Sequence, residues 1–292
     1  MATMSDSPTR MPSAFIGHGN PMNALELNRY TRAWRAFGAA APRPRAILVI
    51  SAHWYINATA VTAMARPRTI HDFYGFPQAL FDIEYPAPGL PELAERIADF
   101  VEPTWIGRDV DSWGIDHGTW SVLVHAFPDA DIPVVQLSVN AEKPMDYHLA
   151  LGRRLGPLRR EGVLIVGSGN VVHNLRAVDF SRPDSAYDWA ERFDEHAREI
   201  LLTGPADVPS LDADRDFPLA VPTADHFLPL LYVAGLAAGD GETFEPLVSG
   251  HAAGSISMAS YTVGLECPST AGPADGPAAP LPTGVPPDAT NL

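Results

Sequence analysis

Four short apolar runs, separated by longer segments with helical spacing, constrain the fold of this chain most strongly. The runs cover residues 12–16, 46–51, 132–137 and 163–166, and turn residues bound most of them. Short apolar runs of this kind, rich in β-branched residues, are typical of buried strands. Their alternation with helices predicts a single α/β domain with a mainly parallel central sheet flanked by helices.

The segments between these runs carry the mixed apolar periodicity of helices. A partly alternating stretch at 256–265 predicts a further strand at an edge of the sheet, and residues 204–222 are expected to form a loop without regular structure. The predicted helices cover residues 21–40, 90–101, 117–127, 144–161, 185–203 and 223–238.

The two ends of the chain differ in character from the domain that we expect over residues 12–267. Residues 1–11 predict a flexible N-terminus. Residues 268–292 contain seven prolines among Ala, Gly and Thr, without apolar periodicity. Such a segment buries too little surface to offset the entropy of ordering it, so we expect a disordered tail that can be removed without loss of activity.

The composition narrows the possible functions. A net charge of −15 argues against a protein that binds nucleic acid, because phosphate contacts need a basic surface. No apolar stretch approaches the roughly 20 residues that span a bilayer. The first eleven residues lack the apolar segment of a secretory signal. We therefore expect a cytoplasmic protein that binds neither nucleic acid nor membrane.

Four histidines follow an apolar run or open a predicted helix. His18 lies between two glycines, His53 comes just after an apolar run, His173 follows a Gly-Ser-Gly-Asn sequence, and His226 precedes an apolar helix. Open α/β sheets carry ligands beyond the carboxyl ends of their strands, and imidazole is the commonest metal ligand in proteins. With Cys267 as the single cysteine, a metal would be held by nitrogen and oxygen.

The remaining histidines have different contexts. His117 opens another predicted helix and is a second candidate for the site. His71 begins an aromatic, glycine-rich loop at residues 71–77. Three others fall within helical patterns and are interpreted as solvent-exposed positions: His125, His148 and His196.

Taken together, these segments resemble the class III extradiol ring-cleavage dioxygenases (the LigB-like superfamily), and most closely the bacterial DOPA 4,5-dioxygenase-like branch. The resemblance spans about residues 12–265, with the motifs in the same order, and the tail falls outside it. It rests on residues 17–22, 51–54, 71–73, 75–80, 116–118, 168–175 and 226–230.

The resemblance implies a mononuclear non-haem Fe²⁺ site, with Zn²⁺ as a possible substitute. It carries His18, His53 and His226 over as ligands, with His173 as a fourth ligand or the acid–base residue. His117 would lie against the substrate. Many relatives complete the site with a glutamate, whereas this chain offers His226, as the DOPA-like branch does. An all-histidine site also suits zinc, so the metal stays open at this point.

The implied reaction inserts both atoms of O₂ into a catechol, beside its diol, to give a muconate semialdehyde. His173 is our first candidate for accepting the catechol proton, and His117 is the second. The loop that begins at His71 would cover the ring of a DOPA-like substrate by offset stacking. Its aromatic side chains are Phe73, Tyr74 and Phe76.

Two alternatives remain from the residues themselves. A zinc-dependent hydrolase would use the same histidines, with Asp225 or Asp116 as general base. A non-catalytic, Memo-like binding protein would keep the fold and the pocket. Oxygen uptake with a catechol distinguishes the dioxygenase from both. The physiological catechol, 4,5 against 2,3 cleavage and the oligomeric state stay open.

Overall fold

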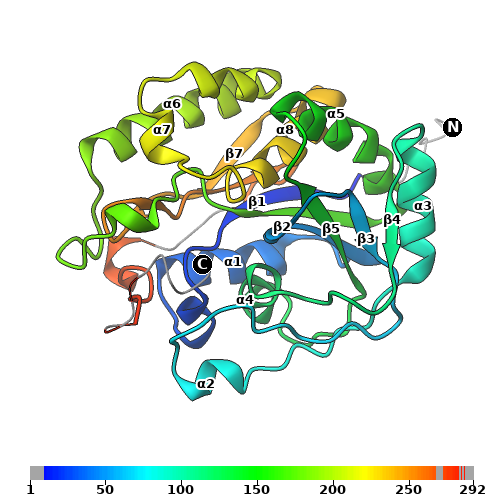
Figure 1. The fold of residues 1–292 in the computed structure, drawn as a ribbon, viewed down its shortest axis with the longest axis horizontal. Helices are drawn as coiled ribbons and strands as arrows, with labels where there is room; N and C mark the ends of the chain where they lie inside the picture. Colours follow the sequence, from blue (N-terminus) through cyan, green and yellow to red (C-terminus); the bar gives the residue numbers. More distant parts are fainter. Residues whose placement is uncertain (1–9, 268–271, 283, 285, 287–292) are drawn as a thin grey trace, which may run out of the picture.

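One sheet of eight strands forms the centre of the molecule (Figure 1). The computed structural model describes residues 10–267, 272–282, 284 and 286. The strands of this sheet are β1 (Ser13–Gly17), β2 (Ala46–Ile56), β3 (Ala60–Thr62), β4 (Gly107–Asp109), β5 (Val134–Asn140), β6 (Val163–Gly169), β7 (Phe244–Val248) and β10 (Ser260–Val263). Their order is β4-β3-β5-β2-β6-β1-β10-β7, and β8 (His251–Ala252) pairs with β9 (Ile256–Ser257) in a separate small sheet.

The middle of the sheet is parallel, and antiparallel pairs flank it. β5, β2, β6 and β1 pair in parallel, while β10 pairs antiparallel with both β1 and β7, and β3 pairs antiparallel with β5. The fold is therefore the α/β domain with a mainly parallel sheet that the sequence predicts. All four predicted strands are present, and β2 extends to Ile56, so that it contains His53.

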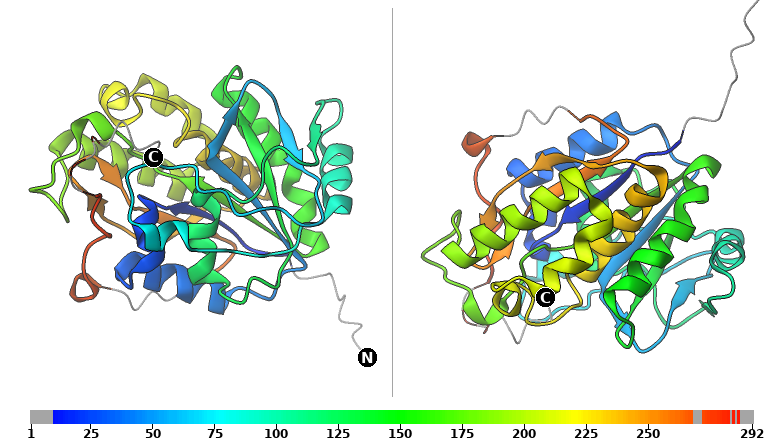
Figure 2. Two further views of the ribbon diagram at one scale, coloured as in Figure 1. Left: turned by 60° about the horizontal axis from the view of Figure 1, so that its bottom comes forward. Right: turned by 90° about the horizontal axis from the view of Figure 1, so that it is seen from above.

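Helices cover both faces of the sheet (Figure 2). Side chains alternate along each strand, so Phe15 of β1 belongs to one apolar core while its neighbours Ala14 and Ile16 belong to the other. One face is covered by α1 (Arg29–Ala40) and α4 (His117–Ala126). The opposite face is covered by α3 (Pro91–Val101), α5 (Met145–Leu155), α6 (Asp188–Thr203) and α8 (Leu228–Asp240).

Shorter helical turns connect these elements. Within the part of the chain that the structure describes, no helix has the length and apolar content needed to cross a membrane. The short helices are η1 (Pro21–Leu25), α2 (Gln78–Phe81), η2 (Gly156–Glu161), η3 (Leu175–Ala177), η4 (Pro205–Ala213), α7 (Phe217–Ala220) and η5 (Pro273–Asp275).

Three predictions of secondary structure from the sequence differ from the structure. The helix predicted over 21–40 is divided, because the Asn28 side chain accepts from the backbone of Tyr30 and Thr31 and starts α1 there. The loop predicted at 204–222 contains η4 and α7. The last strand, β10, is not at an edge, since β7 pairs with its far side.

Both chain ends also differ from expectation where the structure describes them. Met11 is buried and exchanges two hydrogen bonds with Arg159, so the domain begins before residue 12. The prediction that nothing after Cys267 packs is wrong for part of the tail, because Ala278, Ala279 and Leu281 are buried on the domain. Residues 1–9 and, within the predicted tail, residues 268–271, 283, 285 and 287–292 lie outside the described residues.

Candidate metal centre

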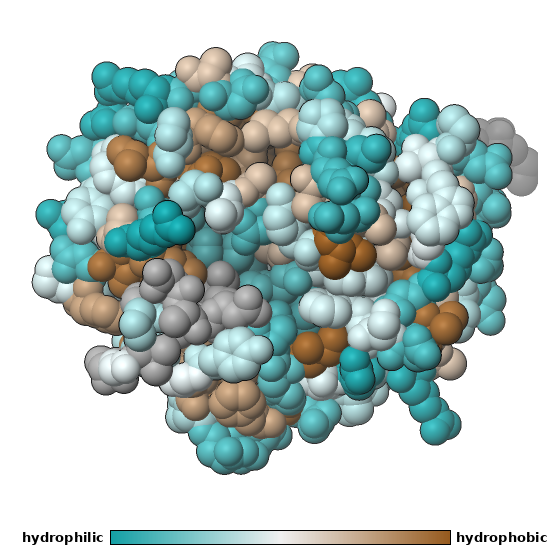
Figure 3. All heavy atoms as spheres, viewed as in Figure 1, coloured by the Kyte–Doolittle hydropathy of each residue, from teal (hydrophilic) through white to brown (hydrophobic). Residues whose placement is uncertain are grey.

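Three neighbouring parallel strands bring histidines to one edge of the sheet. His18 directly follows β1, His53 lies in β2 beyond its pairing with β6, and His173 comes four residues after β6 ends. Because β6 lies between β1 and β2, their carboxyl ends converge. Figure 3 shows hydrophilic residues gathered in a hollow near the middle of the face drawn in Figure 1.

Two helix starts complete a cluster of five imidazoles. His117 is the first residue of α4, and His226 lies just before α8. The ring centroids of His53 and His117 are 3.7 Å apart, and those of His173 and His226 are 3.6 Å apart in a stacked pair. His18 lies 5.1 Å from His53 and 5.4 Å from His226, measured between centroids. All five sequence-predicted histidines of the site are therefore together.

Glycines allow the backbones around this cluster to approach closely. A Cβ atom on Gly118 would lie 2.6 Å from Ser51 Oγ and 2.7 Å from His53 Cδ2. A Cβ atom on Gly169 would lie 2.1 Å from the carbonyl oxygen of His226. Any larger residue at either position would displace an imidazole of the cluster.

The hydrogen bonds of Ser168 determine which nitrogen of His18 faces the cluster. Ser168 Oγ donates to the carbonyl of Gly118 at 2.5 Å, so it accepts from His18 Nδ1, 3.0 Å away. The proton of His18 therefore lies on Nδ1, and Nε2 carries a lone pair. Such a hydrogen bond to the outer nitrogen is typical of metal-binding histidines.

Carboxylates orient other rings in the same way. His226 Nδ1 donates to Asp225 Oδ2 at 2.7 Å. Asp72 lies between two rings, with one carboxylate oxygen 3.0 Å from His117 Nδ1 and the other 3.5 Å from His53 Nδ1. The hydrogen bond to Asp225 leaves His226 Nε2 for the centre of the cluster, and the two Asp72 contacts place a carboxylate beside the outer nitrogens of His53 and His117.

The inner nitrogens fit a bound cation. His18 Nε2 and His53 Nε2 are 3.1 Å apart, and the proton on His18 Nδ1 leaves the lone pair of its Nε2 facing His53. Ligands about 2.0–2.1 Å from a tetrahedral ion are separated by about 3.3 Å, close to this spacing. The Nε2 atoms of His117, His173 and His226 are buried and have no hydrogen-bond partner among the described residues.

Among the described residues, one group of possible metal ligands differs from the set that the resemblance implies. Ligand atoms of His18, His53 and His117 all lie within 4.8 Å of one another. His226 is adjacent to this group, with its ring centroid 5.0 Å from that of His53. His117 is therefore placed to act as a ligand as well as to contact substrate.

Burial favours the neutral form of three of the imidazoles. It lowers the pKa of His18, His53 and His173 well below the usual value of 6.5, and the neighbouring histidines lower each further. Burial alone would raise the pKa of Asp225, but the contact with His226 outweighs it and lowers that pKa. The site thus presents neutral nitrogen ligands beside an ionised carboxylate.

One of the two carboxylates that a hydrolase could use, Asp116, is already engaged. Asp116 accepts from Ser51 Oγ and from Gln136 Nε2, each at 2.7 Å, and it caps α4 through the backbone of Thr119. Burial, and then the charge of Asp72, raise the pKa of Asp116 to about 6. This carboxylate fixes the start of α4, and its hydrogen bonds leave few lone pairs that could accept a proton from water.

The aromatic loop lies behind the cluster. Phe73 is buried, with its ring 5.4 Å from that of His117, and Phe76 packs on Phe73. Tyr74 is 67% exposed, and His71 faces the carbonyl of Ile83 at 2.9 Å.

Two of the histidines interpreted as solvent-exposed are buried. His125 donates from Nε2 to the carbonyl of Asn23 at 2.8 Å and accepts from Arg35 Nε at 3.3 Å. His148 is buried beside the Tyr232 hydroxyl, 3.0 Å from its Nδ1. The prediction fails because α4 is apolar on all sides and the α5–α8 contact covers His148. His196 is confirmed as a surface position, with a 44% exposed side chain.

The sequence analysis missed the residues that orient the imidazoles. Asp72 lies in the segment 71–73 and Ser168 in the segment 168–175, and the sequence pattern assigns a role to neither. Their adjacency to the histidine motifs in the chain is the available signal, since metal-binding imidazoles need acceptors at their outer nitrogens.

Comparison with known proteins identifies the family. Residues 15–263 match the family described as the catalytic LigB subunit of aromatic ring-opening dioxygenase. The chain belongs to this family. A 4,5-DOPA dioxygenase extradiol of Escherichia coli (strain K12) is 50% identical over 266 residues, covering 88% of this chain and 96% of the relative. A 4,5-DOPA dioxygenase extradiol of Beta vulgaris is 37% identical over 256 residues, covering 85% and 94%.

A solved structure supports the same assignment. The crystal structure of an uncharacterized protein from Escherichia coli K12 has a TM-score of 0.77 and 44% identity to this chain, covering 87% of it and 100% of that chain. The LigB-like resemblance is thus confirmed, and the chain is an extradiol dioxygenase. Family membership favours this enzyme over the zinc hydrolase and the non-catalytic binding protein.

Proposed function

We propose that this LigB-family enzyme cleaves the ring of DOPA or a related single-ring catechol beside its diol, with one Fe²⁺ per chain. The product would be a muconate semialdehyde. The names of the curated relatives support the substrate class. The observation that carries the metal dependence is the set of three buried Nε2 atoms, of His117, His173 and His226, that have no hydrogen-bond partner among the described residues.

His18, His53 and His226 would hold the metal, with His173 as a fourth ligand or an acid–base residue. Bound Fe²⁺ would supply a cationic centre for the catechol oxygens and a path for electrons from the catecholate to O₂. The all-nitrogen donor set also accommodates Zn²⁺ as a substitute. His117 would contact the substrate, and its distance to His18 and His53 makes it the alternative third ligand.

His173 is the residue that we propose for proton transfer. Its pKa is lowered by burial, so its neutral ring can accept the proton of a catechol hydroxyl at Nε2 and later return it. The stacked ring of His226 and the hydrogen bond from the His173 backbone to Ala220 at 2.8 Å fix its position. His117, held by Asp72, is the second candidate.

The aromatic loop would form the wall of the substrate site. Phe73 contacts the His117 ring, so it can position that imidazole and shape the space that a catechol ring would occupy. Tyr74 would lie at the rim, because it is exposed, and Phe76 would support Phe73. His71 would brace the base of the loop through the carbonyl of Ile83.

Oxygen uptake tests the proposal. The protein is loaded with Fe²⁺ without air and mixed with DOPA and related catechols, and O₂ is measured with an electrode while the yellow product is followed by absorbance. We expect one O₂ per catechol with the wild-type protein and none with His53→Ala. Catechol turnover without O₂ uptake, or equal uptake by His53→Ala, would overturn the proposal.

A further inference from the structure

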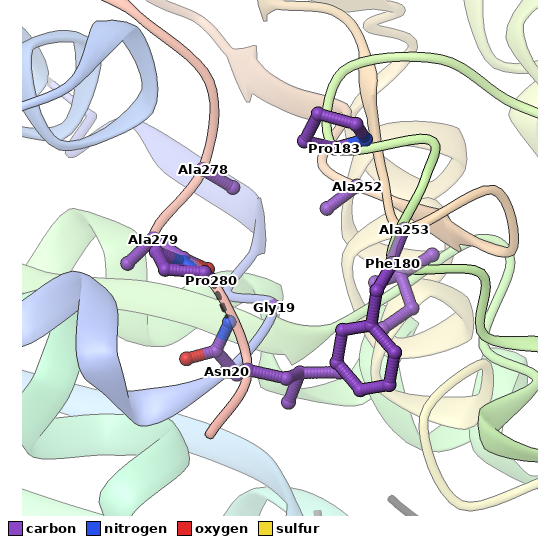
Figure 4. Close-up of a pocket in the computed structure, with 11 residues that line it drawn as sticks. Gly19, Asn20, Phe180, Pro183, Ala252, Ala253, Ala278, Ala279 and Pro280 are labelled. Atoms are coloured by element: carbon purple, nitrogen blue, oxygen red, sulfur yellow. Dashed lines mark hydrogen bonds between the residues drawn. The ribbon is translucent and has the colours of Figure 1, made fainter. Parts of the chain in front are cut away.

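Beyond the matched family region, part of the C-terminal segment returns to the loop that carries His18. We call residues 275–282 the strap. Ala278, Ala279 and Leu281 of the strap are buried, and the carbonyl of Ala279 accepts from Asn20 Nδ2 at 2.7 Å. Figure 4 shows the strap on one side of a small apolar pocket, with the Asn20 amide reaching it.

Asn23 connects the strap to the backbone of His18. Its Oδ1 accepts from the backbone of Ala279 at 2.9 Å and from Asn28 Nδ2 at 2.9 Å. Its Nδ2 donates to the carbonyl of His18 at 3.1 Å. Asn23 is fully buried, and its own carbonyl accepts from His125. One amide therefore joins the strap, the start of α1 and the His18 loop.

The His18 loop needs such anchors because glycines flank it. Gly19 has a φ of +63°, a conformation that glycine adopts readily, so the loop has little intrinsic preference for one path. The backbone N–H of His18 donates to Gly169 at 3.1 Å, and its ring donates to Ser168. Asn23 supplies the third anchor, at the His18 carbonyl.

We propose that the strap is a positioning element of the metal site and that Asn23 is the residue through which it acts on His18. The inference rests on the proposed metal site at His18. When the strap is docked, Ala279 holds the Asn23 amide plane so that Nδ2 faces the His18 carbonyl. Without the strap, the Asn23 side chain keeps its hydrogen bond from Asn28 but loses the one from the Ala279 backbone.

Three chains of different length test the strap, with Zn²⁺ affinity measured by competition with a chromophoric chelator. A chain that ends at Cys267 lacks the strap, and we expect it to bind Zn²⁺ about 10-fold more weakly, the lower end of the effect of outer-shell changes. A chain that ends at Pro282 keeps the strap and is the matched control, with full-length affinity. Melting of the metal-free chains, followed by circular dichroism, confirms that each is folded.

Asn20→Asp tests the coupling without shortening the chain. The aspartate keeps the acceptor for the Met22 backbone, but it loses the donor to Ala279 and faces that carbonyl with a charge. We expect a several-fold loss of Zn²⁺ affinity in the full-length chain and no further loss in the chain that ends at Cys267. The same non-additivity is expected in kcat/KM of the iron-loaded enzyme.

The outcomes separate this inference from the proposed function. If the full-length chain binds no Zn²⁺, the metal site itself is wrong. If it binds Zn²⁺ and the chain ending at Cys267 binds equally well, the strap has no positioning role. An equal effect of Asn20→Asp in both chain lengths would also contradict the inference, because it would place that effect within the loop. If the chain ending at Cys267 does not fold, the full-length variant decides: unchanged Zn²⁺ affinity of full-length Asn20→Asp would overturn the inference.

Discussion

Helix α4 carries a buried histidine near each end, and the two differ in what their ring nitrogens contact. His125, in the last turn, has a protein partner at both nitrogens. His117, the first residue, faces Asp72 with Nδ1, while its Nε2 meets no hydrogen-bond partner among the described residues. Both rings are shielded from water, so burial does not separate them. The two rings differ at Nε2 of His117, which has no hydrogen-bond partner among the described residues. An unpaired buried nitrogen is costly unless a ligand satisfies it.

The same contrast holds between the site and the rest of the molecule. Each site imidazole with a defined outer partner directs Nε2 toward the others, as for His18 on Ser168 and His226 on Asp225. At the other end of α4, His125 ties Asn23 to Arg35 and stabilises the packing of the helix. Histidines of the first kind should control metal and turnover, and those of the second kind should control stability.

The largest effect is expected within the cluster. His53→Ala should remove a ligand and leave no metal above background by elemental analysis, with no measurable oxygen uptake. His173→Ala should keep most of the metal but lower kcat on the order of 100-fold, as for loss of an acid–base residue. Equal loss of metal in both variants would make His173 a ligand, and metal retained by His53→Ala would contradict the site. His196→Ala is the control.

A smaller effect is expected at the outer partner of His226. Asp225→Asn keeps an acceptor for Nδ1 but removes the charge, so metal affinity should fall about 10-fold. Asp214→Asn removes the same charge beside the exposed His196 and should leave affinity unchanged. Competition titrations with a chelator measure both. Equal affinities for the two variants would show that the carboxylate of Asp225 does not tune the site.

Acid should act on a histidine outside the cluster. Burial lowers the pKa of His148 to about 4, below the 6.5 expected in the unfolded chain. The unfolded chain therefore binds this proton first, and stability falls as pH drops from about 6.5 to 4, by at most about 3 kcal/mol. His148→Gln should flatten this part of the pH dependence in urea unfolding. An unchanged slope would show that His148 does not carry it.

The smallest effects should come from the other helical histidines. His125→Ala removes two hydrogen bonds, each worth about 0.5–1.5 kcal/mol, while the Asn23 carbonyl keeps the Glu26 N–H. The free energy of unfolding should therefore drop by about 1–3 kcal/mol. His196→Ala removes a half-exposed ion pair and should cost less than about 1 kcal/mol. Both folded variants should still bind one metal ion per chain. A His125 variant that is stable but binds no metal would break the distinction between the two ends of α4.

The sequence predicts the histidines of the site better than the residues that hold them in place. His18, His53 and His173 could be found because apolar, β-branched runs mark the parallel strands near whose carboxyl ends they lie. The burial of His125 was missed although α4 has no charged face, a pattern of a helix covered on all sides. The strap was missed because Ala and Pro carry little apolar surface, and its docking depends on Asn20 and Asn23, more than 250 residues away in the chain.

The position of the metal tests the account most directly. Anomalous diffraction from crystals of the iron- or zinc-loaded protein would locate the ion without assuming its ligands. We predict one ion per chain, about 2.0–2.2 Å from the Nε2 atoms of His18 and His53, with His226 or His117 as the next ligand. An ion elsewhere, or an ordered His18–His53 pair with no ion in metal-saturated crystals, would contradict the account.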